Sequence, residues 1–305
     1  MKPTILILLL CQFICLLQPV QAAKKIKVAC VGNSITYGTG IANRDTDSYP
    51  AQLQTLLGPQ YTVGNFGKPG ATLLVHGHRP YIQQEEYQKA LHFAADIVII
   101  HLGINDTDPR NWPNYRDEFV HDYVQLIKSF KKVNPQCRIL VAHMTPIADR
   151  HPRFISGTQQ WHEEIQKAIS VVGQVSQAEV IDFHTPLYPY PILLPDAIHP
   201  NEEGARLLAQ TAYSAITGDY GGLKLPILYT DYMVLQRNIP LRIHGTANTK
   251  TPVTVSIDGQ KKKTITDKNG KWEVILDPIK AGANYELSIQ TPQQSRTFHH
   301  VAAGE

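Results

Sequence analysis

The sequence predicts an α/β protein with a three-layer, doubly wound parallel sheet, followed by a second, small antiparallel β-sandwich domain. Two observations support this prediction. From about residue 26 to 217, short apolar runs alternate with longer stretches of helical periodicity, which is the pattern of βαβ units. From about residue 224 onward, apolar and polar residues alternate one by one, as in strands with one solvated face. The 305 residues suffice for both parts.

Five strands are expected in the first part. Each is short and rich in β-branched residues, and three are almost continuously apolar. Strands buried on both faces have this character, so the sheet is expected to be parallel, with helices on both sides. The segments are IKVACVG (26–32), YTVGNFG (61–67), ADIVIIHLG (95–103), CRILVAHM (137–144) and AEVIDFH (178–184).

Helices are expected between the strands. Ser48 is the candidate N-cap of a helix that stops at Gly58, and Pro200 or Asn201 could begin the last one. In segment 114–134 apolar residues recur at helical spacing. The candidate helices are SYPAQLQTLLG (48–58), NYRDEFVHDYVQLIKSFKKVN (114–134), GTQQWHEEIQKAISVVG (157–173) and NEEGARLLAQTAYSAITG (201–218).

The second part carries turn signals between its strands. Asp258-Gly259 and Asn269-Gly270 predict hairpins in VTVSIDGQKKKTITDKNGKWEVIL (253–276). YELSIQ (285–290) and SRTFHHV (295–301) continue the alternation. The lysines at 261–263 are expected along a solvated strand edge. These patterns place a domain boundary near residue 220, with one domain at 24–220 and the β-sandwich at 221–305.

The N-terminus has the pattern of a secretory signal peptide over residues 1–23. Lys2 precedes the apolar stretch ILILLLCQFICLL, and small residues follow that suit cleavage after Ala22 or Ala23. A lipoprotein anchor at Cys11 or Cys15 is the alternative, but the preceding Leu10 and Ile14 are not small. The protein is therefore expected to be secreted or periplasmic.

Bulk composition excludes several classes of partner. The formal net charge is only +3, with 18% charged residues, so no footprint for nucleic acid or an anionic membrane is present. No later segment is long and apolar enough to span a membrane. Cys30 and Cys137 lie in apolar runs and are interpreted as buried thiols, although a disulfide between them stays open.

Polar residues suited to chemistry follow several strands. Ser34 comes directly after the first strand, in Gly32-Asn33-Ser34. Gly67 and Gly70 follow the second strand, where glycine lets a backbone approach a ligand. Asn105 and Asp106 follow the third. In open α/β sheets ligands bind at this end of the strands. Each motif also has an ordinary role, since serine, asparagine and aspartate cap helices and turns.

Asp196 and His199 lie three residues apart before the last helix. On such a turn the carboxylate can orient the imidazole, and histidine is the natural general base near neutral pH. With Ser34 and the oxyanion donors they make the complete set for acyl transfer. The set is far less credible as an accident than any one motif, so Ser34 is interpreted as a nucleophile.

These blocks, in this order, resemble the SGNH (GDSL-type) hydrolase superfamily, whose fold is flavodoxin-like. GNSIT (32–36) matches the serine block and NFGKPGAT (65–72) the glycine block. GIND (103–106) and DAIHP (196–200) match the two remaining blocks. The resemblance covers about residues 26–217.

The resemblance implies a role for each matched residue. Ser34 would be the nucleophile, His199 the base and Asp196 its orienting partner. The oxyanion hole would consist of the Ser34 and Gly70 backbone N–H groups and the Asn105 side-chain amide. The usual aspartate before the serine is Asn33 here; that position is outside the triad, so activity is not put in doubt. The Asn105-Asp106-Thr107 glycosylation sequon would lie inside the pocket and is discounted.

The second part resembles the N-terminal β-domain of sialate O-acetylesterases in LPILYTDYMVLQRNIPLRIHGTA (225–247) and TDKNGKWEVILDPIKAGANYELSI (266–289). In that family a serine esterase domain follows. The resemblance therefore leads to the hypothesis that a further esterase domain continues beyond residue 305.

The resemblance implies a secreted serine esterase that removes O-acetyl groups from glycans. Sialic acid is the first substrate expected, and acetylxylan or another acetylated polysaccharide the second. No cofactor or metal is expected; His76 and His78 form an HxH without a third ligand. Aromatic residues could contact sugar or pack in the core: Trp112, Tyr115, Trp161, Tyr188 and Tyr190. A non-catalytic carbohydrate-binding protein is the alternative of another class.

Overall fold

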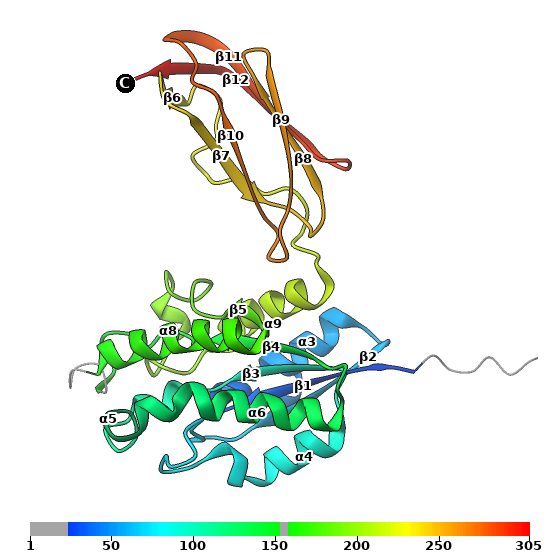
Figure 1. Cartoon of the computed structure of the whole chain (residues 1–305), viewed down its shortest axis with the longest axis vertical. Helices are drawn as coiled ribbons and strands as arrows, with labels where there is room; N and C mark the ends of the chain where they lie inside the picture. Colours follow the sequence, from blue (N-terminus) through cyan, green and yellow to red (C-terminus); the bar gives the residue numbers. More distant parts are fainter. Residues whose placement is uncertain (1–23, 153–157) are drawn as a thin grey trace, which may run out of the picture.

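The computed structural model describes residues 24–152 and 158–305, so the predicted signal peptide lies outside the described residues. The chain has an α/β part and a β-rich part (Figure 1), each with its own hydrophobic core. The first is built from residues between Val28 and Ile216, and the second from residues between Leu223 and Ala303. The first surrounds a sheet of parallel strands, and the second lies between two sheets of mostly antiparallel strands.

The first part holds a five-stranded sheet in the order β2-β1-β3-β4-β5, with every neighbouring pair parallel. The strands lie close to the predicted segments, and the apolar runs of the three central strands β1, β3 and β4 are buried from both sides, whereas the edge strands β2 and β5 are only partly buried. The strands are β1 (Ile26–Gly32), β2 (Tyr61–Gly67), β3 (Ile97–His101), β4 (Arg138–His143) and β5 (Glu179–Asp182). The predicted α/β fold is confirmed.

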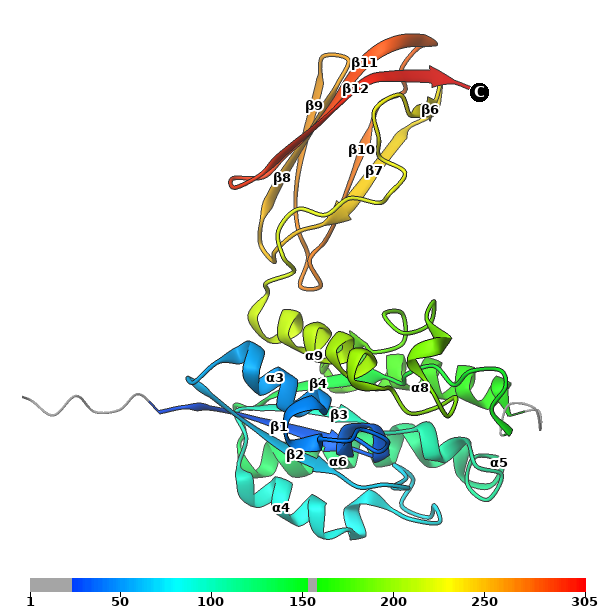
Figure 2. The same ribbon diagram turned by 180° about the vertical axis from the view of Figure 1, so that it is seen from behind.

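Helices cover both faces of this sheet (Figures 1 and 2). α3 (Tyr49–Leu57) and α9 (Glu202–Thr217) pack together on one face. α4 (Glu85–Phe93), α6 (Phe119–Val133) and α8 (Gln159–Ser176) lie along the other. Because β1 has β2 on one side and β3 on the other, the chain reverses its direction across the sheet between β1 and β3, where open α/β sheets bind ligands.

Three details differ from the prediction. Ser48 precedes α3, but its hydroxyl donates to the Arg44 carbonyl at 2.6 Å instead of capping the helix. The helix expected from residue 114 begins at Phe119, after the short helix α5 (Trp112–Tyr115) and a 3₁₀ turn. Sequence patterns did not indicate α4, whose nine residues bury only Ala90.

Cys30 and Cys137 are both free, buried thiols, so the interpretation without a disulfide is correct. Burial raises the pKa of the Cys30 thiol to about 12. A thiol held neutral in this way behaves as a small apolar core residue.

The C-terminal region forms two packed sheets. The five-stranded sheet has the order β6-β12-β11-β8-β9, and β10 pairs with β7 in the other. The strands are β6 (Val234–Gln236), β7 (Leu241–Thr246), β8 (Pro252–Ile257), β9 (Gln260–Ile265), β10 (Lys271–Leu276), β11 (Gly282–Gln290) and β12 (Ser295–Gly304). β12 pairs with β6 in parallel, whereas all other pairs are antiparallel.

One of the two predicted hairpins is wrong. Asp258-Gly259 closes the β8–β9 hairpin, with both residues at positive φ. Asn269-Gly270 also forms a tight turn, in which the Asp267 N–H donates to the Lys271 carbonyl at 2.8 Å. This turn instead passes the chain from β9 in one sheet to β10 in the other. A turn signal fixes the local reversal, but the choice of partner strand depends on packing between the sheets.

Candidate active site

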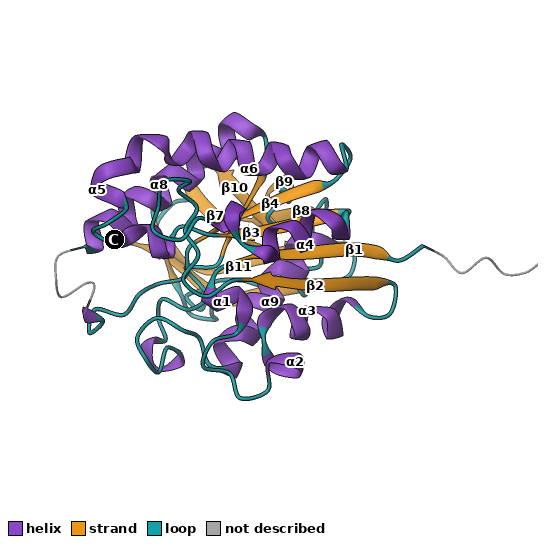
Figure 3. Ribbon diagram, turned by 90° about the horizontal axis from the view of Figure 1, so that it is seen from below, coloured by secondary structure: helices purple, strands orange, loops and turns teal. Residues whose placement is uncertain are grey.

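The first strand ends by delivering Ser34 to the carboxyl edge of the sheet, where Figure 3 shows the loops gathered. Ser34 is the first residue of α1 (Ser34–Tyr37), a single turn. Buried Asn33 caps this turn by accepting the Ile35 N–H at 3.0 Å, and Gly38 ends it in the left-handed conformation. The Ser34 N–H lies at the N-terminus of α1, where backbone N–H groups have no intrahelical acceptor.

The segment between β5 and α9 brings a histidine to this serine. His199 Nε2 lies 2.8 Å from Ser34 Oγ. His199 Nδ1 lies 2.5 Å from Asp196 Oδ2. The other Asp196 oxygen accepts the backbone N–H groups of Ile198, at 3.1 Å, and His199, at 2.7 Å. The Asn201 side chain then caps α9 by accepting the Gly204 N–H at 2.9 Å.

These contacts define the direction of proton transfer. A carboxylate can only accept, so Nδ1–H of His199 donates to Asp196 and Nε2 is left to accept the Ser34 proton. Partial burial opposes ionisation of Asp196, but hydrogen bonds from His199 and Ile198 outweigh it and hold its pKa below the usual range. Asp196 therefore stays ionised while it orients the imidazole.

The two loops after β2 and β3 place further donors beside the serine loop. Gly70 has a φ of 78°, a conformation that other residues adopt only under strain. Its N–H has no acceptor among the residues that the structure describes. The Asn105 amide donates to the Ala71 carbonyl at 2.9 Å, and an amide nitrogen carries a second N–H. These are the donor types that an oxyanion hole requires.

Close backbone packing holds the loop after β2 against the serine loop. The Lys68 N–H donates to the Gly32 carbonyl at 2.9 Å. At Gly67 a Cβ would lie only 2.1 Å from the Tyr37 nitrogen, so only glycine permits this approach. Gly67 thus serves packing, whereas Gly70 presents a free N–H.

Asp106 has a larger role than its sequence context suggests. It is fully buried, and its carboxylate accepts the N–H groups of Leu73 and Leu74, each at 2.9 Å. Burial raises its pKa to about 6, although these hydrogen bonds oppose the rise. Asp106 therefore ties the loop after β2 to the loop after β3. The sequence signal was its position beside Asn105, but nothing there identified its partners.

The two histidines of the HxH motif have different partners. His76 Nδ1 contacts Glu118 Oε2 at 2.7 Å, whereas the His78 N–H donates to buried Asn111 at 2.9 Å. Within residues 24–152 and 158–305, no cluster of three or more potential metal ligands is present. In the same ranges, no helix has both the length and the apolarity to cross a membrane.

The five aromatic candidates fall into two groups. Trp112 is buried and its indole N–H donates to Glu164 at 2.7 Å, and Tyr115 and Trp161 pack against the core. Tyr188 and Tyr190 are 68% and 54% exposed. Only these two remain able to offer a broad aromatic face to a ligand.

Comparison with known proteins agrees with this geometry. Residues 30–207 match the GDSL-like lipase/acylhydrolase family. The chain belongs to this family of carboxylic ester hydrolases. The match covers the predicted serine, glycine, asparagine and histidine blocks, and it spans more than half of the chain.

An acetylxylan esterase from Xylanibacter ruminicola is similar to this chain. The two are 36% identical over 214 residues, which is 65% of this chain and 44% of that protein. The match thus spans less than half the length of that relative. A solved structure of a carbohydrate acetylesterase from Sinorhizobium meliloti has a TM-score of 0.50 at 18% identity, covering 63% of this chain and 98% of the other. This second likeness concerns the fold alone.

Proposed function

We propose that this chain is a secreted carbohydrate O-acetylesterase that works through an acyl-enzyme on Ser34. The observation that carries the proposal is the hydrogen-bonded chain from Ser34 Oγ through His199 to Asp196, with contacts of 2.8 and 2.5 Å. Serine, imidazole and carboxylate in this order are the arrangement of an activated nucleophile.

The reaction would run in two halves. Ser34 Oγ attacks the acetyl carbonyl carbon while His199 Nε2 takes its proton. The oxyanion receives hydrogen bonds from the Ser34 and Gly70 N–H groups and the Asn105 amide. His199 then gives the proton to the departing sugar oxygen. Water, deprotonated by His199, attacks the acetyl-serine. The bond to Ser34 Oγ then breaks, His199 returns the proton to Oγ, and acetate leaves. No metal or cofactor takes part in these steps.

Acetylated xylan is the first substrate proposed. The 36% identical relative is named an acetylxylan esterase, and this supports an acetylated plant polysaccharide over other glycans. O-acetylated sialic acid is the second candidate, because segments 225–247 and 266–289 resemble the β-domain of sialate O-acetylesterases. That resemblance stays a prediction, although a β-rich region lies there.

Acetate release tests this proposal. The wild type, Ser34→Ala and the exposed matched control Ser295→Ala are incubated with acetylated xylan, O-acetylated sialic acid and p-nitrophenyl acetate. We expect release from xylan that Ser34→Ala lowers by about 10³-fold or more and Ser295→Ala leaves unchanged. Release from sialic acid alone would favour the second candidate. Hydrolysis of p-nitrophenyl acetate alone would keep the esterase and reject both glycans. Glycan binding without any turnover would favour a binding protein.

Secretion is part of the same proposal. We propose that residues 1–23 direct export and are removed. Expression of the full chain in a bacterium, followed by N-terminal sequencing of the exported protein, should give a start at Ala23 or Lys24. A cytoplasmic product that begins at Met1 would contradict it.

A further inference from the structure

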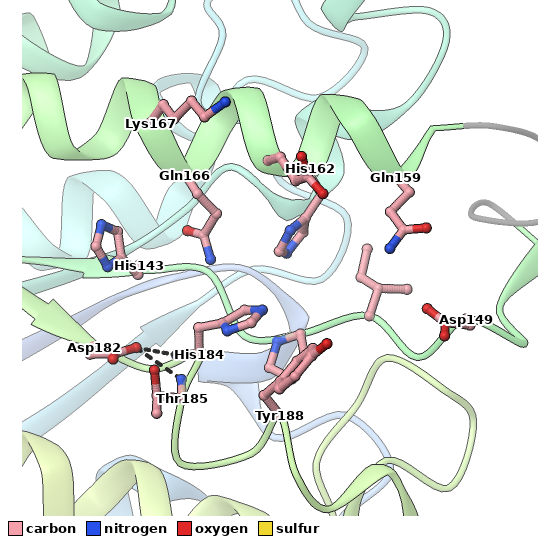
Figure 4. A pocket seen from close by; sticks show the side chains of 13 residues that line it. His143, Asp149, Gln159, His162, Gln166, Lys167, Asp182, His184, Thr185 and Tyr188 are labelled. Carbon is pink, nitrogen blue, oxygen red and sulfur yellow. Dashed lines mark hydrogen bonds between the residues drawn. The ribbon is translucent and has the colours of Figure 1, made fainter. Parts of the chain in front are cut away.

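A cavity of about 520 Å³ lies at the carboxyl ends of β4 and β5, and Figure 4 shows the side chains that line it. None of Ser34, Asp196 and His199 lines it. His143 comes from β4, His162 from α8, and His184 and Tyr188 from the segment after β5. This space, called the β4–β5 pocket below, is not used by the mechanism above.

The pocket directly adjoins the segment that carries Asp196 and His199. Pro146, Ile147 and Asp149 line it, and the intervening Ala148 N–H donates to the Ala197 carbonyl at 2.8 Å. Ala197 lies between Asp196 and His199. A ligand in the pocket is therefore bound beside the segment that carries the catalytic base, at the same edge of the sheet as Ser34.

An aromatic surface forms one side of the pocket. The rings of His184 and Tyr188 stack with centroids 5.1 Å apart at 25°. The turn that carries them is fixed by Asp182, which accepts the N–H groups of His184 and Thr185, each at 2.9 Å. Tyr188 nevertheless stays 68% exposed. A preordered, exposed ring surface is suited to the C–H face of a sugar.

The three histidines are neutral hydrogen-bonding groups. Burial lowers the pKa of His143 and of His184, and it lowers that of His162 to about 4. His162 Nε2 donates to the Thr145 carbonyl at 3.0 Å. The hydroxyl of Ser170 donates to Gln166, so His143 Nε2 donates to that hydroxyl at 2.9 Å and its Nδ1 is left as an acceptor. Neutral rings of this kind suit sugar hydroxyls.

The charge of the pocket opposes an anion. Carboxylates outnumber ammonium groups three to one among the lining residues, which include Asp149, Glu163, Asp182 and Lys167. Because like charges repel across a binding surface, a sialic acid carboxylate is disfavoured here. An uncharged sugar meets no such penalty.

We propose that the β4–β5 pocket binds an uncharged pyranose unit of the polysaccharide whose acetyl ester is presented to Ser34. The assignment rests on the proposed function for its substrate class and goes beyond it by naming the binding residues. Tyr188 supplies the stacking face, and His143, His184 and the carboxylates supply hydrogen bonds to hydroxyl groups.

Direct binding tests the assignment without any turnover. Xylohexaose without acetyl groups is titrated calorimetrically into the full-length protein carrying Ser34→Ala. Adding Tyr188→Ala should weaken binding about tenfold, whereas Tyr188→Phe, which keeps the ring, should stay within about twofold. Tyr190→Ala is the matched control, since Tyr190 is exposed on the same segment and does not line the pocket. Thermal melting verifies that each variant is folded.

Two results would overturn the inference. One is xylohexaose binding that is absent or is insensitive to Tyr188→Ala. The other is tighter binding of sialyllactose than of xylohexaose, which would contradict an uncharged ligand. Failure of the proposed function is distinguished from failure of this inference by a different experiment. In that case acetylated xylan releases no acetate, while the binding results stand.

Discussion

The side-chain amide of Asn105 donates to the backbone carbonyl of Ala71 at 2.9 Å. This contact joins the loop after β3 to the loop after β2, and Ala71 directly follows Gly70. The two predicted oxyanion donors from these loops therefore belong to one hydrogen-bonded unit. A preorganised unit of this kind loses little free energy to rearrangement when charge develops on the substrate.

Replacing Asn105 tests its role as an oxyanion donor. Asn105→Ala should lower kcat on p-nitrophenyl acetate by about 10²–10³-fold with little change in KM, because the donor acts on charge that develops only in the transition state. Asn114→Ala, on the exposed face of α5, is the control and should retain full activity. A higher KM with unchanged kcat would contradict the assignment.

The buried carboxylate of Asp106 predicts a pH-dependent stability. Burial raises its pKa from 3.8 to about 6, so its contribution to stability is full below about pH 4 and is lost as pH rises through 6. The difference amounts to about 3 kcal/mol. Urea unfolding of the wild type and Asp106→Asn between pH 4 and 7.5 should show the difference in unfolding free energy changing by this order, because an amide does not titrate.

Asp117 is exposed, so the comparison of the wild type with Asp117→Asn is the matched control. Its difference in unfolding free energy should vary far less over the same range. A pH-independent difference between the wild type and Asp106→Asn would show that Asp106 does not titrate as its burial requires.

The five strands of the α/β part could be predicted because their signal is local. Val28 to Val31 and Ile97 to Ile100 are fully or almost fully buried, and continuous apolar runs report such burial in the sequence itself. Helix α4 gives a weaker signal, since it packs on the sheet mainly through partly buried residues such as Tyr87 and Leu91. The passage of the chain from one sheet to the other at Gly270 depends on contacts between the sheets, so the local sequence does not predict it.

The site residues also divide into those that the local sequence predicts and those that it does not. Ser34 and Asn105 follow strand ends, and Asp196 and His199 precede the last helix. All four stand in short blocks, so their order in the sequence indicates their convergence. The partners of Asp106 lie 32 and 33 residues away in a loop without periodicity. The histidines of the β4–β5 pocket come from the end of β4, from α8 and from the segment after β5. They carry no spacing motif, because the pocket forms only when α8 packs beside β4 and β5.

The hydrogen bond between Asp196 and His199 predicts a large effect of an isosteric change. In Asp196→Asn the amide can donate to Nδ1, which places the imidazole proton on Nε2 and removes the acceptor for Ser34. We expect kcat to fall by about 10²–10⁴-fold without loss of folding. Asp258→Asn, in the β8–β9 turn, controls for the change in charge. Activity of Asp196→Asn within about twofold of wild type would remove Asp196 from the triad.

Gly70 and Gly58 allow the strain of a positive φ to be separated from a catalytic effect. Both have a positive φ, 78° and 76°, and neither offers a Cβ a severe clash, the closest atom at Gly70 being Arg79 Nη1 at 3.3 Å. Gly70→Ala and Gly58→Ala should each lose about 1 kcal/mol of unfolding free energy, because alanine is disfavoured in this conformation. Only Gly70→Ala should also lower kcat, by about tenfold or more, since relief of the strain moves an N–H that must face the oxyanion. Urea unfolding and p-nitrophenyl acetate kinetics measure the two effects. Equal kcat values for both variants would mean that the Gly70 N–H does not stabilise the transition state.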